Sequence, residues 1–235
     1  GGAKFEQINR FVDRALTADL RNARSNLALS FEHSQSAKSI SQSVGTPDNP
    51  SSLTSHLTRL DTSLRFLESD PSSDVRLKDT LSTAKAITDK LASIEADIQT
   101  QRQRADSQIA TEVKKLNENL QKIVVLNSEI ISAKVNGYDT STWLDQRKKL
   151  IDEVSEIVPV RELQRENEAI SLVSANGMVL IETSAVTFDF TRTNLIVPHM
   201  TAAGRDLGNL TLEGDEIAID TPSGQVSGGS LQGLF

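Results

Sequence analysis

The chain has 235 residues, no cysteine, and 25 Lys and Arg against 32 Asp and Glu, which gives a formal net charge of −7. Without cysteine it can form no disulfide, no thiolate zinc site and no cysteine nucleophile. The acidic balance disfavours a general nucleic-acid binder, and the sequence has no apolar run near the roughly 18 residues of a membrane-spanning helix.

The first expected element is a long helix within residues 3–44, a stretch that contains neither Pro nor Gly. The dense breaker Gly45–Pro50 ends this segment. Apolar residues recur along it at the spacing of one helix face, which predicts an amphipathic helix. These residues are Phe5, Ile8, Val12, Leu16, Ala23, Leu27, Phe31 and Ile40.

A second helix is expected between this breaker and Pro71. Its leucines alternate steps of four and three residues, which is the seam of a heptad repeat. Ser51 or Ser52 is predicted as the N-cap, and Asp70 followed by Pro71 as the stop. The leucines of the seam are Leu53, Leu57, Leu60, Leu64 and Leu67.

The third segment, residues 73–135, keeps an apolar spacing of three and four residues. As one continuous helix it would be on the order of 90 Å long, and it would need partners along its length. Its middle, Gln99–Gln108, is strongly polar. Two interpretations of this middle are open: a weakly packed stretch or short break, and a site that another chain covers.

A fourth helix is expected after the stop at Asn136-Gly137. Thr142, with Asp145 three residues later, resembles the start of a capping box, and the Asp would lie near the positive end of the helix dipole. Trp143, the only Trp, is expected to pack in the core or at its edge. The apolar face of this helix consists of Leu144, Leu150, Ile151, Val154 and Ile157.

After Pro159 the pattern changes from helical to β, since seven of the twelve Gly fall between Gly177 and Gly229. Asn176-Gly177 is a strong hairpin signal, and Glu213-Gly214-Asp215 marks a second hairpin candidate. We expect a small β-module of roughly five to seven strands. The expected strands include Ile170–Val173, Met178–Ile181, Val186–Phe190, Leu210–Leu212 and Ile217–Ile219.

These patterns predict an α+β multidomain protein, in which an elongated antiparallel helical bundle, or rod, carries a small and mostly antiparallel β-domain. The predicted domains are residues 1–157 for the long-helix bundle, 158–228 for the β-domain, and 229–235 for the start of a return to the helical domain. Residues 158–235 hold ten acidic and four basic residues, a net of −6, whereas residues 1–157 hold 22 and 21. An exposed acidic module of this kind is more typical of a solubility device than of a binding site.

The sequence predicts no catalytic, cofactor-binding or metal site, and the protein is not expected to be an enzyme. It contains no Gly-x-Ser-x-Gly elbow. The segment Gly228–Gly233 lacks the Lys and the Ser or Thr that a phosphate-binding loop requires, so a strand-to-helix connection is expected there. The three histidines match no close-spaced metal motif, and they are His33, His56 and His199.

Carboxylate pairs occur twice in helical or hairpin contexts, where solvated charge is the default interpretation. These pairs are Asp152/Glu153 and Glu166/Glu168. A glycan hydrolase that uses Glu213 or Asp215 of the β-module is a minor alternative. It would require an activity that is lost when either residue is mutated.

One stretch of the chain has a residue pattern that is more specific than helical periodicity. Leu116-Asn117-Glu118 is followed by Asn127-Ser128-Glu129-Ile130, by Gly137, and by the block Trp143–Ile151 with the sequence WLDQRKKLI. This order resembles the bacterial flagellar hook-associated protein 1 family, the first of the hook–filament junction proteins. In that family a long helix is followed by a Gly, by a Leu-Leu-Asp-Gln-Arg-Asp block and then by the first strands.

Two further segments fit the same family. Phe66–Pro71 resembles its short step between helices, and Ser227–Leu234 resembles its return from the β-region to the helical domain. The chain departs from the pattern at Trp143, which replaces a usual Leu, and at Lys148, which replaces a usual acidic residue. These two changes affect the electrostatic contacts that the block is expected to make, and they do not affect the prediction that it is helical.

The resemblance implies a structural motif instead of an active site. Asp145 would cap the fourth helix, and Arg147 would bind a carboxylate or a backbone carbonyl. The Asp-Gln-Arg core would thereby set the turn between the long helix and the β-module. The motif residues are Gly137, Leu144, Asp145, Gln146, Arg147, Gly229 and Gly233.

Members of this family are exported unfolded through the flagellar type III apparatus and polymerise as a ring between hook and filament. The resemblance therefore implies a secreted, extracellular junction adaptor of the flagellum. Its expected partners are the hook protein, the second hook-associated protein and, in the full-length form, further copies of itself. The helical terminal segments that drive polymerisation are expected to lie outside these residues, with an export-chaperone site in the C-terminal one. This fragment is accordingly expected to be a monomer, with neither nucleic acid nor a membrane as a partner.

A second hypothesis fits the same helical rod and β-head. It is a coiled-coil structural or tip protein of another exported apparatus, such as an adhesin stalk or a secretion needle. The two hypotheses differ in the Trp-Leu-Asp-Gln-Arg block and the Ser-Gly-Gly-Ser-Leu-Gln-Gly-Leu ending, which the second class has no reason to share.

Overall fold

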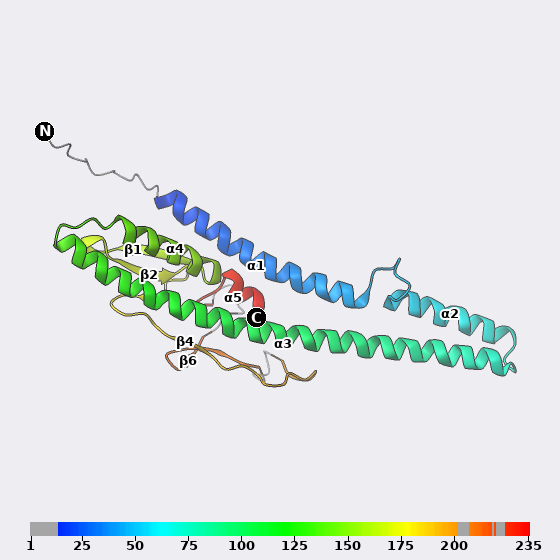
Figure 1. The fold of residues 1–235 in the computed structure, drawn as a ribbon. Helices are drawn as coiled ribbons and strands as arrows, with labels where there is room; N and C mark the ends of the chain where they lie inside the picture. Colours follow the sequence, from blue (N-terminus) through cyan, green and yellow to red (C-terminus); the bar gives the residue numbers. More distant parts are fainter. Residues whose placement is uncertain (1–13, 202–206, 218, 220–223) are drawn as a thin grey trace.

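A computed structural model of the chain describes residues 14–201, 207–217, 219 and 224–235. The molecule is an elongated rod in which helices run lengthwise and small sheets lie at one end (Figure 1). The predicted class, a helical rod with a small antiparallel β-region, is confirmed. None of the helices in the described residues is both long and apolar enough to cross a membrane.

Two helices precede the long one and follow each other along it (Figure 1). They are α1 (Arg14–Val44) and α2 (Leu53–Ser69), and Gly45, at φ +85°, begins the loop between them. The backbone amide of Ser55 donates to Oγ of Ser52 at 3.1 Å, so Ser52 is the N-cap of α2. The helix ends at Ser69, before Asp70-Pro71, as predicted. The apolar positions expected at Phe5, Ile8 and Val12 lie outside the described residues.

The third helix is unbroken. α3 (Asp74–Val135) has 62 residues, which corresponds to about 93 Å at ~1.5 Å per residue. Ser73 is its N-cap, and Asn136 follows its last turn, with Gly137 next at φ +73°. The predicted span is therefore confirmed, and a break in its polar middle is wrong.

The polar middle of α3 is covered by a distant segment of the same chain. Arg102 donates to the carbonyl oxygens of Val197, at 3.3 Å, and of Met200. Gln103 donates to the carbonyl of Thr193 at 3.0 Å, and the amide of Thr193 donates to Asp106 at 3.1 Å. The Asp106 side chain is buried, so this part of the stretch is well packed. The polar side chains satisfy the backbone groups of a strand-poor segment, a role that helical periodicity cannot reveal.

α4 (Ser141–Ile157) returns antiparallel to α3 and leads into two small antiparallel sheets, each of three strands, in the order β1-β2-β3 and β4-β5-β6. The hairpin predicted at Asn176-Gly177 joins β2 to β3, with Gly177 at φ +90°. The six described strands agree with the expected number. They are β1 (Val160–Gln164), β2 (Ile170–Ser174), β3 (Val179–Ile181), β4 (Phe188–Phe190), β5 (Leu210–Leu212) and β6 (Asp215–Glu216).

The second hairpin is shorter than predicted. Glu213 and Gly214 form a two-residue turn with φ of +50° and +96°, and β6 starts directly at Asp215. Two consecutive residues at positive φ match the turn that follows the twist of paired strands. The described strand therefore lies at Asp215–Glu216, earlier than the expected Ile217–Ile219, of which residue 218 lies outside the described residues. β4 also begins later than expected, at Phe188 instead of Val186.

Among the described residues, the hydrophobic core occupies only the sheet-bearing end of the rod. α3 contributes its second half, and residues of α4, both sheets and the final helix α5 (Gly229–Leu234) join it in one cluster. The opposite end exposes large apolar side chains on α2 and the start of α3, among them Phe66, Val75 and Leu81. The cluster extends across the boundary predicted between residues 157 and 158, and that boundary remains a prediction. Its fully buried members include Leu116, Leu120, Ile123, Ile151, Val154, Leu172, Phe188 and Leu231.

Candidate functional site

The turn between α3 and α4 is built differently from the predicted capping box. α4 begins at Ser141, and Oδ1 of Asp139 accepts hydrogen bonds from the amide of Ser141 at 3.1 Å and from its hydroxyl at 2.7 Å. Thr140 occupies the N-cap position without a side-chain cap and instead donates to Glu168 at 3.0 Å. Asp145 therefore lies in the second turn of the helix, and the predicted helix start at Thr142 is wrong. Asp139 starts the helix earlier than Thr142 would.

Arg147 is the buried member of the predicted motif. It is 5% exposed, and its Nη1 donates to Oδ1 of Asn127 at 2.7 Å and to the carbonyl oxygen of Glu168 at 2.9 Å. Asn127 in turn donates to the carbonyl of Ile170 at 2.8 Å. One guanidinium and one amide thus connect α3, α4 and the start of β2. We call Asn127, Arg147 and Glu168 the arginine node.

Glu168 closes the arginine node at the short turn η1 (Glu166–Glu168). Its carboxylate accepts from Nζ of Lys134 at 2.6 Å and from Thr140 at 3.0 Å. Its own backbone and that of Asn167 have positive φ, +62° and +54°, which L-residues rarely adopt. The hydrogen bond from Lys134, with further help from Thr140 and Arg147, outweighs burial and lowers the pKa of Glu168. The interpretation of Glu168 as merely solvated charge is wrong.

The other motif residues lie outside the arginine node. Leu144 is half-buried and Asp145 is exposed, and Gln146 is exposed beside a shallow apolar groove between α3 and α4. Val125 and Leu150 line the same groove. Gly137 is required by the turn because of its positive φ, and nothing lies within 4 Å of the position that a Cβ would take.

A second cluster, which the sequence did not reveal, binds α1 to α4 and β1. Arg21 is buried, and its Nε donates to Oδ1 of Asp152 at 2.7 Å, while Nη1 donates to Glu162. Lys148 also pairs with Asp152, at 2.9 Å. Burial alone would raise the pKa of Asp152, but the hydrogen bonds from Lys148 and Arg21 outweigh it and lower the pKa. Asp152 is therefore part of an ion-pair network, contrary to its interpretation as solvated charge.

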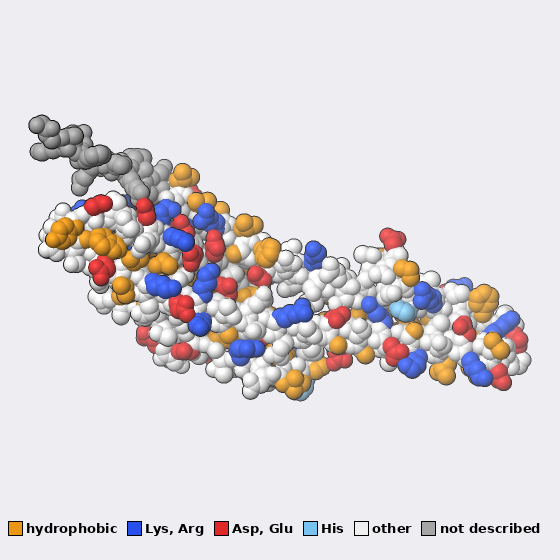
Figure 2. Space-filling view, viewed as in Figure 1, with side chains coloured by type: hydrophobic (Ala, Val, Ile, Leu, Met, Phe, Trp, Pro, Cys, Tyr) orange, Lys and Arg blue, Asp and Glu red, His pale blue; other side chains and the backbone are white. Residues whose placement is uncertain are grey.

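The helix that carries Arg21 has an inverted distribution of side chains. Its inward face holds the buried Arg21 and Ser25, whereas most of its large apolar residues are exposed. Figure 2 shows apolar side chains along the outer side of α1. We call this the α1 ridge, which consists of Leu16, Leu20, Leu27 and Phe31. One feature of the sequence could have indicated this polar inward face. Arg21 and Ser25 are four residues apart, so they share a helix face that is distinct from the α1 ridge.

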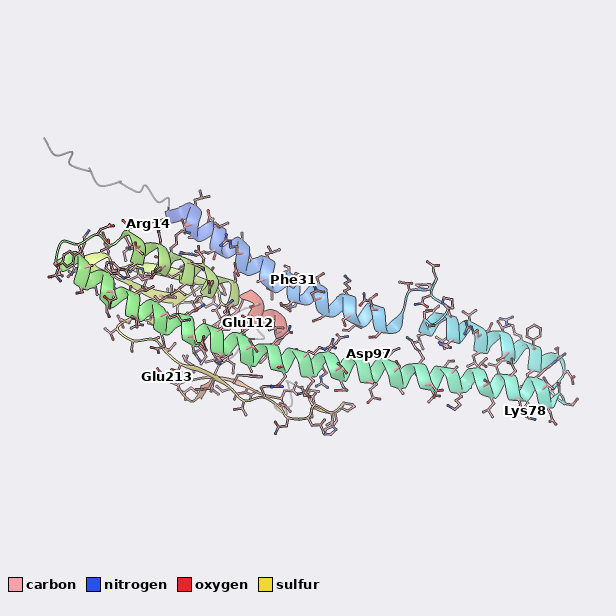
Figure 3. The ribbon with its side chains drawn as sticks, in the orientation of Figure 1. Arg14, Phe31, Lys78, Asp97, Glu112 and Glu213 are labelled. Atoms are coloured by element: carbon pink, nitrogen blue, oxygen red, sulfur yellow. The ribbon has the colours of Figure 1, made fainter. Side chains whose placement is uncertain are left out.

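The final helix lies in a tight cradle formed by α1, α3 and the end of α4. Gly229, at φ +73°, has no room for a side chain, because a Cβ there would overlap the carbonyl oxygen of Ile157. At Gly233 a Cβ would lie 2.7 Å from Cβ of Glu32. Ser230 donates to Glu112 of α3 at 3.3 Å, and Glu112 is seen next to α5 in Figure 3. Two of the three glycines predicted as motif residues, Gly229 and Gly233, thus mark close contacts of α5.

These arrangements orient secondary-structure elements. They consist of ion pairs, hydrogen bonds from side-chain amides to the backbone, and close contacts at glycines. These interactions position the helices against the sheets. Among the described residues, no three His, Asp or Glu side chains come close enough together to hold a metal ion. The geometry is that of a packed structural junction.

A family model described as the flagellar hook-associated protein FlgK helical domain matches residues 37–235. The chain belongs to this family. The match includes the α3–α4 turn, the arginine node and α5, and it therefore covers most of the helical rod and all of the described sheets. The predicted family is confirmed.

Curated relatives carry the same name. The chain is 25% identical over 186 residues to flagellar hook-associated protein 1 of Salmonella typhimurium and to that of Salmonella typhi. The aligned part is 78% of this chain and 33% of each relative, so the chain spans about a third of their length. The solved structure of the flagellar hook junction protein FlgK from Burkholderia pseudomallei has the same fold, with a TM-score of 0.70 over 93% of this chain and 38% of that one, at 19% identity.

Proposed function

We propose that this FlgK-family chain is part of a structural adaptor at the junction of the flagellar hook and filament, and that it acts without catalysing a reaction. The family match over residues 37–235 carries this proposal. The names of the relatives, hook-associated protein and hook junction protein, support the same location. The second hypothesis, a tip or stalk protein of another exported apparatus, is not favoured by any of these matches.

The shape of the molecule supports a mechanical role. α3 is continuous over 62 residues, and the arginine node joins it to α4 and β2 at the sheet-bearing end. Arg21 attaches α1 to the same end through two carboxylates. An adaptor that connects two assemblies requires such lengthwise helix packing and connections between elements, and it requires no active site.

The α1 ridge supports assembly through helix packing. Leu16, Leu20, Leu27 and Phe31 repeat at steps of four, seven and four residues, the pattern of a coiled-coil seam, yet they are exposed. Exposed apolar surface of this kind is typical of an interaction site. We propose that the full-length protein uses such helical surfaces to assemble with copies of itself, with the hook protein and with the second hook-associated protein.

The remaining proposals concern export and oligomeric state. The adaptor is secreted and lies outside the cell, with its export-chaperone site in the C-terminal region of the full-length protein, and this segment alone is a monomer. Light scattering behind size-exclusion chromatography tests the last point directly, since a monomer has a mass of 25.6 kDa. A stable ring or dimer of the isolated segment would contradict it.

The decisive experiment is complementation of a strain that lacks the gene. The full-length protein is expected to restore filaments and swimming, whereas a full-length variant with Leu27→Gln and Phe31→Gln in the α1 ridge is expected to fold and be exported but to leave hooks without filaments. Leu195→Gln, which replaces a similarly exposed leucine away from α1, is the matched control and is expected to swim. Normal swimming of the deletion strain would overturn the proposed function.

A further inference from the structure

Apolar burial on the inward face of α1 is too small to account for its position. That face consists of Arg21, Ser25, the half-buried Leu29 and Glu32, while the four large side chains of the α1 ridge point outward. Amphipathic helices normally dock by burying their apolar face. α1 must therefore be held by something other than its own hydrophobic surface.

The helix α5 provides close packing that the inward face of α1 does not provide by itself. It lies between α1 and α3 near the end of α4 (Figure 1), and its Leu231 is fully buried. On one side Gly233 approaches the backbone of α1, where a Cβ would lie 3.1 Å from the carbonyl oxygen of Leu29. On the other side Gly229 lies against the backbone of Ile157. α5 is thus a wedge that contacts α1 and α4 at backbone distance.

α1 also contacts α4, α3 and β1, but two polar groups around α5 oppose its docking. Oγ of Ser25 is buried and has no hydrogen-bond partner among the described residues, and it lies 3.6 Å from the Cβ position of Gly228. Glu32, beside Gly233, faces the like charge of Glu112 on α3. An unsatisfied hydroxyl and a like-charge pair both oppose the docking of α1. The ion pairs of Arg21 and the contacts with α5 must offset them.

We propose that α5 is a latch that keeps α1 on the rod, and that loss of the α5 contacts releases α1 as a unit while the core of α3, α4 and the sheets stays folded. The released unit pivots at the loop after Gly45, because α2 packs on α3. Subglobal opening of this kind is expected for an element with few buried apolar contacts. In this proposal the short helix α5 controls the position of a helix that begins more than 200 residues earlier in the sequence.

Hydrogen exchange with mass spectrometry tests the latch in the intact chain. Gly233→Leu is expected to accelerate exchange of the α1 amides by roughly tenfold or more, with unchanged protection in the second half of α3. Gly233→Ala is the milder variant: it favours the α5 helix intrinsically, so faster exchange in α1 would arise from the overlap with Glu32 and not from a weaker α5. Gly137→Ala is the control, since it adds a methyl group in open space and is expected to leave α1 unchanged.

A distance measurement provides a second readout. Because the chain has no cysteine, spin labels can be placed on Asn22→Cys of α1 and Lys114→Cys of α3, both exposed. The distance distribution is expected to be narrow in the otherwise unchanged chain and to broaden towards longer distances with Gly233→Leu. Unchanged exchange in α1 would overturn the latch. Equal acceleration in α1 and α3 with Gly233→Ala would overturn it as well, because α1 would then open only with global unfolding.

Discussion

Nη1 of Arg147 lies 2.7 Å from Oδ1 of Asn127, and this contact between two buried polar side chains joins α4 to α3 at the point where the first sheet begins. Asn127 also accepts a hydrogen bond from the amide of Ile170 at 3.4 Å and donates to its carbonyl, so it acts in place of a neighbouring strand for that residue. Arg147 in turn donates to the carbonyl of Glu168, whose backbone is in a conformation that L-residues rarely adopt. One guanidinium from α4 thus helps to hold the start of β2 in its place in the first sheet.

Replacement of Arg147 by Met is expected to lower the free energy of unfolding by about 2–4 kcal/mol, because buried acceptors at Asn127 and Glu168 lose a charged donor. Urea denaturation followed by circular dichroism measures this change. Lys148→Met, one residue away in the same helix, is the control, and its half-exposed ion pair with Asp152 predicts a loss of at most about 1 kcal/mol. Equal effects of the two substitutions would contradict the role of the arginine node.

Stability is expected to fall in acid as Glu168 and Asp152 become protonated. Both have a pKa below the ordinary values of 4.5 and 3.8, so each contributes stability that is complete above that value and is lost as the pH falls through the lower folded pKa. Urea midpoints measured between pH 7 and pH 3 test this. Glu168→Gln should be less stable than the parent at pH 7, and the difference should shrink below pH 4.5. A constant difference across that range would show that Glu168 does not contribute through its charge.

Glu32 is expected to behave in the opposite sense. Burial, with a smaller effect from Glu112, raises its pKa above 4.5, so the charged form is disfavoured in the folded chain. Glu32→Gln should therefore stabilise the protein slightly at pH 7, by less than about 1 kcal/mol, and this gain should disappear as the pH falls to 4.5. Thermal melts at the two pH values measure it. A destabilising effect at pH 7 would mean that the carboxylate has a favourable partner.

Gly229 and Gly137 form a matched pair, because both have φ +73° and only the first has neighbours at its Cβ position. Gly137→Ala is expected to cost about 1 kcal/mol from the backbone conformation alone. Gly229→Ala adds an overlap with the carbonyl oxygen of Ile157 and is expected to cost at least about 2 kcal/mol more. The difference in urea midpoint between the two variants isolates the close contact of α5. Equal losses would show that α5 can shift to accommodate a methyl group.

The helices were predictable because their signals are local. Ser52, Asp70-Pro71 and Asn136-Gly137 act within one turn of the helices they bound, and the apolar spacing of α3 persists for its full length. The start of α4 was misplaced because two local signals competed, and Asp139 was the one that formed the turn.

The contacts that position α1 and the polar middle of α3 were not predictable, since they join residues far apart in the chain. Arg21 and Asp152 are separated by 131 positions, and Arg102 and Met200 by 98. Helical periodicity identifies the face on which such a residue lies but not the partner that it meets. The same limit explains why Asp152 and Glu168 were interpreted as solvated charges. Only the tertiary arrangement shows that cations on other elements neutralise them.

The uninterrupted course of α3 determines how the rod responds to force. One column of backbone hydrogen bonds connects Asp74, the first residue of α3, with Val135, its last. A bending or twisting load applied at the Asp74 end passes along this column without a hinge and reaches the densely packed end, where both sheets contact α3. Because the hydrophobic core lies in that end, bending is expected in the slender half, where α3 packs against α2, and the packed end acts as its rigid base.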